Sequence, residues 1–455
     1  MLNPVCFSRG TASQARGVAA LTVVMVLFFV MALVAAYTNR NLIFEQRISL
    51  GNYRSSRAAE AAEASVNWAL SLLNSGRLNS QCQPSVDPND VDFRRMSTRV
   101  PGPGSFAPEG AYVTPLDYNT VNERVWGCVI AAGAVSCACP TTTTPNPAIT
   151  RPADGKGSAF HVTVYVPEGG TPQAGSLGLL GFACGSLGDG NNDCSRSTGR
   201  GGTPRVDGIS GVSQAVGLLR ALPLAPQATL TVGGAVNAAA GTLLVANPDN
   251  TSGYTVLSGL AYTPGNARND SFRLPAGSIG EGRQQNIIAL NILANQVNDG
   301  WFRSLFAMDR LSYGLQPAAQ VINCAAVCTE ANLAPVILAF PRNPIIMNGP
   351  VNIGSAVGPL VPLGNAAEPV MLVINGALTI TANASITGFV HANSVAWNAT
   401  TATLVGALMT PGDFTIGPGG VARMSFDKPS IDLIKYRYGS FVRVPGSWNV
   451  REYYR

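Results

Sequence analysis

The sequence predicts an α+β fold: one long N-terminal helix, then a β-rich head, then a repetitive β region that resembles part of a β-solenoid. Two observations support this prediction. Residues 18–39 carry no charged side chain and continue into a two-faced helical pattern, whereas short strands with glycine at fixed offsets recur near the C-terminus. The 455 residues are enough for an anchor and two or three domains.

We expect five parts along the chain. They are a leader at 1–17, a transmembrane and amphipathic helix at 18–76, a disulfide-containing α+β region at 77–225, a β-rich region with a helical insert at 226–340, and a repetitive β region with the C-terminal tail at 341–455.

The uncharged run is long enough to cross a membrane, because about 20 apolar residues span a hydrocarbon core of about 30 Å. Arg9 and Arg16 precede it without an acidic residue, and positive charge in front of an apolar span keeps that end cytoplasmic. The bulk of the chain is therefore expected on the other side of the membrane.

The helical pattern does not stop at the end of the apolar run. Charged residues such as Arg54, Arg57 and Glu60 then alternate with apolar ones as far as Leu70. At about 1.5 Å per residue the helix is expected to be roughly 85–90 Å long. We expect it to end near Gly76, as a C-cap in the left-handed conformation.

Two other interpretations of this segment remain open. The first is a secretory signal with a small-residue cleavage site at Val34-Ala35-Ala36, which gives a mature chain that begins at Tyr37. The second is a plain anchor that keeps Met1 and carries a long stalk. The mature N-terminus distinguishes these alternatives from a chain whose helix is retained.

Composition excludes several functional classes. Charged residues make up 12% and hydrophobic residues 46%, which is typical of a chain with cores and not of a disordered one. The net charge of +5 comes without a basic stripe, so we predict no nucleic-acid partner. Because no nucleophile–base or metal motif is recognisable, we also predict no enzyme activity, no cofactor and no metal.

The cysteine content indicates an oxidising compartment. Apart from Cys6 there is an even set of eight, and we expect Cys184–Cys194 and Cys324–Cys328 as local pairs. The remaining four, with Cys82 reaching towards the others, allow three connectivities: Cys82, Cys128, Cys137 and Cys139. The alternative, a zinc site, is disfavoured because paired C-x-x-C spacings are absent.

A candidate calcium site lies in the loop between Cys184 and Cys194. Asp189, Asn191 and Asp193 supply oxygen ligands of the kind that Ca²⁺ prefers. The loop lacks the closing bidentate Glu of an EF-hand, so a solvated turn is the simpler interpretation.

The middle of the chain is expected to be mixed. Residues 81–110 form a connecting loop, 124–130 and 159–166 form strands, and 209–221 form a helix that stops before Pro223. His161, on the second strand, is expected to be a packed structural residue.

Further on, short strands are expected at 229–232, 242–245 and 254–257, and a helical insert at 284–299 and 301–308.

Internal repetition is clearest after residue 340. Residues 348–353 are echoed by 375–380 and 411–416, and residues 385–390 by 403–408. The second echo places Gly388 and Gly406 eighteen positions apart. Stacked solenoid coils explain this repetition, with glycine at the corners; a β-sandwich with similar strand lengths is the alternative.

The basic leader, Gly17 and the retained apolar helix together resemble a type IV prepilin. The resemblance implies that a prepilin peptidase cuts between Gly17 and Val18 and methylates the new terminus. The fifth mature position, usually Glu in this family, is Thr22 here. Since an unpaired buried carboxylate is costly, Thr22 fits a subunit with no neighbour beyond it; the alternative is that Thr is simply tolerated there.

More specifically, the segment from Arg16 to Ala58-Ala59-Glu60-Ala61-Ala62-Glu63 resembles the N-terminal domain of PilX-type minor pilins, and residues 439–448 resemble the tail of large proteins that carry it. The resemblance implies a single-pass inner-membrane protein with a periplasmic C-terminus, assembled at an extracellular pilus tip. Its implied partners are the major pilin, other minor pilins and a tip adhesin. A surface-anchored adhesin and a tip pseudopilin of type II secretion are the alternatives.

Overall fold

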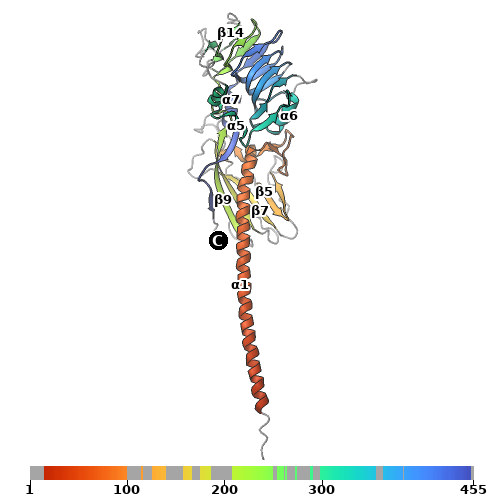
Figure 1. Cartoon of the computed structure of the whole chain (residues 1–455), viewed down its shortest axis with the longest axis vertical. Helices are drawn as coiled ribbons and strands as arrows, with labels where there is room; N and C mark the ends of the chain where they lie inside the picture. Colours follow the sequence, from red (N-terminus) through yellow and green to blue (C-terminus); the bar gives the residue numbers. More distant parts are fainter. Residues whose placement is uncertain are drawn as a thin grey trace, which may run out of the picture.

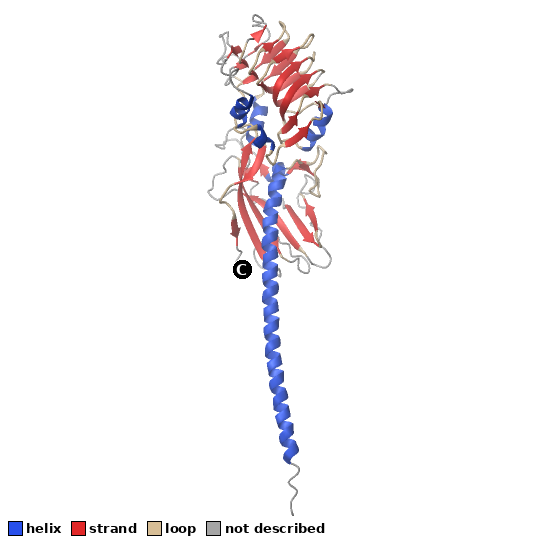
Figure 2. Ribbon diagram, viewed as in Figure 1, coloured by secondary structure: helices blue, strands red, loops and turns tan. Residues whose placement is uncertain are grey.

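The computed structural model describes residues 15–99, 114–115, 126–139, 157–165, 175–185, 208–249, 254–260, 262–263, 272–273, 287–289, 298–354, 362–382 and 384–451. A single long helix projects from a head that has two lobes (Figure 1). The lower lobe surrounds the C-terminal half of the helix, and the upper lobe is a stack of strands beyond the end of the helix (Figure 2). The predicted fold class is confirmed.

The long helix, α1 (Ala15–Asn74), has 60 residues and no interior proline. Gly51 does not break it. The helix ends at Asn74, as the sequence indicates, but the predicted reason is wrong: Gly76 is not among the residues with positive φ. Glycine is needed there because a Cβ would lie 2.0 Å from the backbone oxygen of Ala339.

The lower lobe is an antiparallel sheet in the order β26-β9-β8-β7-β5-β6, with β27 also paired to β9. The described strands are β5 (Trp126–Ala131), β6 (Ala134–Ala138), β7 (Ser158–Tyr165), β8 (Ser176–Cys184), β9 (Ile209–Arg220), β26 (Gly439–Arg443) and β27 (Asn449–Arg451). The strands predicted near 124–130 and 159–166 are therefore confirmed as β5 and β7 where the structure describes them.

The helix predicted at 209–221 is wrong, because this segment is strand β9. Its apolar residues fit both a helical and an extended period, which short apolar runs do not resolve. Pairing decides the conformation: β9 lies between β8 and the C-terminal strands, and Val212 and Val216 are buried beneath α1. No local signal reveals that a strand from residue 439 completes this sheet.

The predicted loop at 81–110 is also more structured than expected. The described part includes β1 (Arg77–Leu78), β2 (Val91–Asp92), α2 (Phe93–Ser97) and β3 (Thr98–Arg99), which pairs with β4 (Thr114–Pro115). Phe93 is fully buried and anchors the segment against α1. Residues 100–110 lie outside the described part.

The upper lobe is a solenoid, because all pairings among its described strands are parallel and successive coils stack in register. The β-sandwich alternative is thereby excluded. Its described strands are β10 (Ala228–Val232), β11 (Val236–Asn237), β12 (Leu243–Ala246), β13 (Tyr254–Ser258), β14 (Tyr262–Thr263), β15 (Phe272–Arg273), β16 (Ile287–Ala289), β17 (Gln320–Asn323), β18 (Cys328–Thr329), β19 (Ile345–Asn348), β20 (Val351–Ile353), β21 (Val370–Ile380), β22 (Ser385–Trp397), β23 (Thr403–Thr410), β24 (Phe414–Ile416) and β25 (Ala422–Ser425).

The coils are not stacked in sequence order. Strand β10 pairs with β13 on one side and with β23 on the other, and β13 pairs with β16. The chain thus builds the distal coils first, returns to the end near α1, and stacks β17 to β25 back towards β10. Strands from both 226–340 and 341–425 therefore belong to one sheet, whereas β26 and β27 belong to the sheet of the lower lobe.

The solenoid has an inner and an outer apolar layer. Inside, residues in register form an aliphatic column that includes Leu372, Val390, Leu408 and Leu230. On one outer face, α4 (Asn298–Phe306), α5 (Arg310–Gly314) and α7 (Lys428–Arg437) cover a second cluster, and α6 (Glu330–Ala339) lies at the proximal end (Figure 1).

The helical insert is confirmed in part. Helix α4 covers most of the predicted 301–308 segment, but the part of 284–299 at Ile287–Ala289 is strand β16. The β-branched pair Ile287 and Ile288 pairs in parallel with β13, so solenoid stacking overrides the helical pattern.

Candidate assembly helix and its junction with the head

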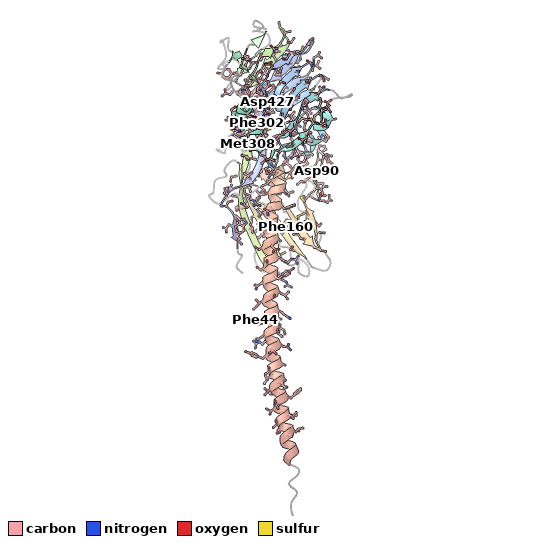
Figure 3. The ribbon with its side chains drawn as sticks, in the orientation of Figure 1. Phe44, Asp90, Phe160, Phe302, Met308 and Asp427 are labelled. Carbon is pink, nitrogen blue, oxygen red and sulfur yellow. A yellow bond between two sulfur atoms is a disulfide. The ribbon has the colours of Figure 1, made fainter. Side chains whose placement is uncertain are left out.

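The N-terminal half of α1 exposes its apolar side chains on every side. Leu21 is 63% exposed and Phe28 75% exposed. Phe44 projects from the part of the helix that the head does not cover, which we call the bare half (Figure 3). The helix is long and apolar enough to span a membrane, and none of its most apolar window is buried in the protein. A surface this apolar is unstable in water and calls for a bilayer or other helices around it.

The C-terminal half of α1 packs on the lower lobe through small residues. Ala58, Ala62, Val66 and Ala69 recur at helical spacing and are buried. Opposite them the sheet supplies glycine: a Cβ on Gly181 would lie 1.8 Å from the Ser65 hydroxyl oxygen. The close contact fixes the helix against β8 and β9, so the bare half projects in a defined direction (Figure 1).

The last residue of α1 is bonded to the C-terminal strand of the sheet. The Asn74 side chain accepts a hydrogen bond from the Phe441 backbone N–H (2.8 Å) and donates one to the Phe441 carbonyl (3.0 Å). The Asn343 side chain donates to the Asn74 carbonyl (3.1 Å). One residue thereby links the helix to both lobes, and its polar groups are satisfied although it is 7% exposed.

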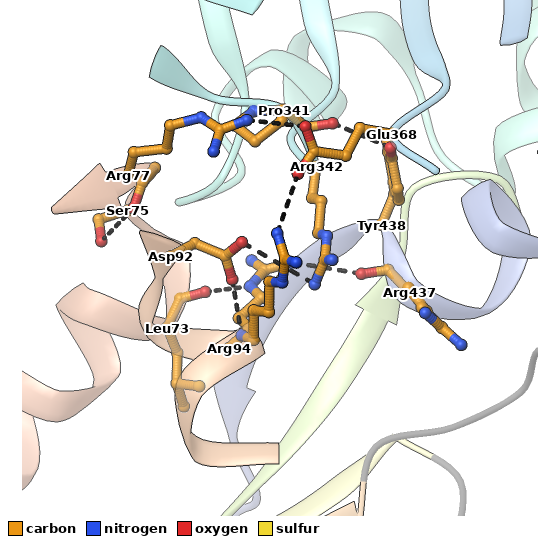
Figure 4. Close-up of polar contacts among 12 residues, drawn as sticks. Leu73, Ser75, Arg77, Asp92, Arg94, Pro341, Arg342, Glu368, Arg437 and Tyr438 are labelled. Atoms are coloured by element: carbon orange, nitrogen blue, oxygen red, sulfur yellow. Dashed lines mark hydrogen bonds and ion pairs between the residues drawn. The ribbon is translucent and has the colours of Figure 1, made fainter. Parts of the chain in front are cut away.

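A group of buried arginines surrounds the same helix end (Figure 4). Arg94 donates to the carbonyls of Leu73 and Gly439, so it caps the helix and holds strand β26. Burial lowers the pKa of Arg94 to about 10, partly offset by the charge of Asp92. At neutral pH the guanidinium stays charged, and its donors serve the unpaired carbonyls of the helix C-terminus.

Arg77 carries the network into the upper lobe. Its guanidinium pairs with Glu368 (2.7 Å) and donates to the Leu338 carbonyl (2.8 Å). Arg342 from the upper lobe reaches back to Asp92 (3.8 Å). The two lobes are thus joined by two ion pairs. In one the arginine comes from the segment after α1, and in the other it comes from the upper lobe; these side chains are mostly buried.

Tyr438 completes the junction from the segment between α7 and β26. Its single hydroxyl proton is shared between the carbonyls of Pro341 (2.9 Å) and Pro369 (2.6 Å). Burial raises the pKa of the phenol far above its usual value, so the group remains a neutral donor. The junction was not predicted from the sequence; the available signal was Arg77 and Arg94 shortly after a helix end, in a chain with only 12% charged residues.

The residues expected at the processing site lie in one helix. Gly17 and Val18 fall within the first turns of α1, and Thr22 is an exposed residue one turn further on. In the single chain, all residues from 20 to 50 are exposed. Access to Gly17 and the use of the Val18 terminus remain expectations.

The cysteines cluster in the lower lobe and at one solenoid corner. Cys82 is bonded to Cys139 and Cys128 to Cys137, which is one of the three connectivities left open by the sequence. Cys324 is bonded to Cys328, the local pair expected at the start of the solenoid. Cys184 is disulfide-bonded, and Cys194 lies outside the described residues.

The candidate calcium ligands Asp189, Asn191 and Asp193 also lie outside the described residues. Within the described part, no group of three or more His, Cys, Asp or Glu side chains is placed to hold a metal ion. His161 is 9% exposed on β7, and His391 is fully buried on β22 against the rings of Phe302 and Phe306. Both histidines therefore lie in packed sheet positions.

A long apolar helix that is fixed at its far end to a disulfide-bonded, β-rich head is the architecture of a type IV pilin-like protein. Residues 16–67 match the family model described as PilX N-terminal, which covers most of α1 and none of the head beyond it. The chain thus carries the N-terminal domain of PilX-type minor pilins, as its sequence predicts.

A comparison with curated proteins finds no match. Among solved structures, one similar chain is the competence-associated pilin ComZ from Thermus thermophilus. It is 9% identical over 88% of this chain and 98% of that chain, with a TM-score of 0.20. Similarity at this level supports no conclusion about function.

Proposed function

We propose that this protein is a minor pilin that sits at the tip of a type IV pilus, primes assembly of the fibre, and supports an adhesin. Before assembly it would be held in the inner membrane by α1, with the head in the periplasm, after a prepilin peptidase has cut between Gly17 and Val18. The role is structural and not enzymatic.

One observation carries the proposal. The bare half of α1 is apolar on all sides, whereas the other half is fixed to the sheet by Ala62, Ser65 and their glycine partners. A rod of this kind fits first into a bilayer and then among similar rods, with the other minor pilins and the major pilin as its neighbours. Thr22 supports a terminal position, since it needs no partner for a buried charge.

Deletion of the chain tests the proposal directly. We expect surface fibres to be lost on deletion and restored by the wild-type chain, and mass spectrometry of the assembled protein to give Val18 as its first residue. Normal fibres with lost attachment would support an adhesin, and a secretion defect with normal fibres would support a type II pseudopilin. A mature chain that begins at Tyr37 would lack the apolar part of α1, and it would overturn the proposal that the protein assembles through this helix.

A further inference from the structure

A pocket of about 480 Å³ with both polar and apolar lining lies where α7 meets the solenoid. Segments that are far apart in the sequence form it: residues 225–227 before β10, Asp249 and Tyr254 around the start of β13, and one face of α7. Phe426 and Ile431 supply apolar lining. Pockets of 300–1,000 Å³ with a few convergent polar groups are the usual size for small-molecule sites.

Helix α7 presents a periodic set of side chains to this pocket. Lys428, Asp432, Lys435 and Tyr436 lie at spacings of four, seven and eight, so they share one helix face. Ile434 and Ser430 are buried against the solenoid instead. The polar lining is thus built on a rigid element with a packed opposite side, and not on a loop.

The two lysines that line the pocket differ in whether a carboxylate of the protein pairs with them. Lys428 donates to the Asp432 carboxylate (2.5 Å), and this bond raises the pKa of Lys428. Lys435 makes no ion pair with any described residue, and its ammonium lies 4.9 Å from the centre of the Tyr436 ring. The guanidinium of Arg220 approaches the same ring at 5.2 Å. Two cations thus lie near one aromatic ring, and of these two Lys435 lines the pocket.

This combination matches the chemistry of a sugar acid. The C–H face of a pyranose packs on aromatic rings, which Tyr254 and Tyr436 provide. Asp249 and Gln227 add side chains that hydrogen-bond hydroxyl groups. An ammonium group that makes no ion pair with any described residue favours a negatively charged substituent, since charge-assisted hydrogen bonds are the strong ones.

We propose that this pocket binds an acidic saccharide, with the sugar ring against Tyr436 and Tyr254 and its carboxylate at Lys435. Helix α7, which carries much of the site, lies at the side of the head and away from the N-terminal half of α1 (Figure 1), so packing of that half in a fibre would leave the site accessible. The proposal does not depend on the assembly role: the chain would contact a glycan itself, whether or not it also supports an adhesin.

Isothermal titration of the full-length chain tests this, in a zwitterionic detergent because alkyl glycosides carry a sugar headgroup. The probes are glucuronic acid and glucose. We expect binding of glucuronic acid and at least tenfold weaker binding of glucose, since a hydrogen bond to a charged group is worth about a factor of ten. Equal binding of both sugars, or binding of neither, overturns the proposal.

A pair of variants assigns the site. Lys435→Gln should weaken glucuronic acid binding by about tenfold, whereas Arg423→Gln, which removes the same charge from an exposed position outside the pocket, should leave it unchanged. Equal losses in both variants would show attraction to net charge alone and overturn the site. Thermal unfolding of each variant verifies that it is folded. Fibre counts are independent of this readout, so failure of one proposal is distinguishable from failure of the other.

Discussion

Asn74 shows how a single side chain can join a helix to a distant strand. It satisfies both backbone groups of Phe441, which are buried. Asn74→Ala would leave a donor and an acceptor without partners, each at a cost of about 1–3 kcal/mol. We therefore expect a loss of about 2–4 kcal/mol in the free energy of unfolding, measured by urea titration of the detergent-solubilised chain.

Asn67→Ala is the matched control, because Asn67 is on the same helix but exposed, and its hydrogen bond with Arg443 lies in contact with solvent. Its stability should stay within about 0.5 kcal/mol of the wild type, as for most surface changes. If the two alanine variants unfold at the same urea concentration, the link between Asn74 and β26 carries no stability.

His391 predicts how the protein responds to acid. It is fully buried, and burial, followed by the charge of Arg310, lowers its pKa from 6.5 to about 3. Since the folded pKa lies below the unfolded one, the unfolded chain takes up the proton first as pH falls. The contribution of the neutral imidazole to the free energy of unfolding is therefore complete above pH 6.5. It is lost progressively as the pH falls towards 3, and the total loss is up to about 5 kcal/mol.

His391→Phe removes this titration and keeps an aromatic side chain of similar shape beside Phe302 and Phe306. We expect the melting temperature of the variant to fall less than that of the wild type between pH 6.5 and 4, measured by circular dichroism. Parallel melting curves across this range would mean that His391 does not couple folding to pH.

At the scale of elements, Gly388 and Gly406 define the solenoid repeat. They pair directly in the β22–β23 register, and both have positive φ, at 140° and 137°. A Cβ on Gly406 would lie 1.8 Å from the Gly388 carbonyl oxygen. We expect Gly406→Ala to cost about 3 kcal/mol or more, because strain at such a φ alone costs of the order of 1–3 kcal/mol.

Gly419→Ala provides the comparison, since Gly419 has a φ of 76° but no heavy atom within 4 Å of the position that a Cβ would take. Only the left-handed conformation is penalised there, at about 1–2 kcal/mol. Chemical unfolding of both variants measures the difference. Equal stabilities would show that the coils do not approach each other as closely as the pairing of Gly388 with Gly406 requires.

The same elements show what the sequence can reveal. The eighteen-residue spacing of Gly388 and Gly406 predicts stacked coils because corner glycines repeat with each coil, and α1 is evident from its uncharged run. The helix predicted in place of strand β9 is wrong because the local pattern does not determine the partners of that segment. The order of the coils was not predictable either, because residue 230 pairs with residue 408, which is far away in the sequence.

The junction residues escaped prediction for the same reason. Arg77 and Glu368 are 291 positions apart, and neither belongs to a recognisable motif. Their pairing brings the segment after α1 next to the residues before β21, which is a property of the complete topology. The N-terminal helix, by contrast, is a local pattern, and it is also the part that the family model matches.

At the scale of the whole molecule, the junction makes the two lobes one body on the end of α1. Arg77, Arg94 and Asn74 connect the helix end to both lobes, so a force on the head would reach the helix through them if the protein has the tip position proposed above. Because the charged groups are largely buried, loss of one partner leaves the other charge without compensation. Coupling of the lobes should therefore depend on individual residues.

Glu368→Gln tests this coupling. It would leave the charge of Arg77 buried without its partner, which typically costs about 3–5 kcal/mol. We expect faster hydrogen exchange on both sides of the junction, in residues 75–92 and 338–343, and proteolysis between the lobes. Asp432→Asn is the control, because its partner Lys428 is 48% exposed and surface pairs contribute about 1 kcal/mol or less. Unchanged exchange at the junction in Glu368→Gln would mean that packing of Tyr438 and Phe441, and not the charge network, holds the lobes together.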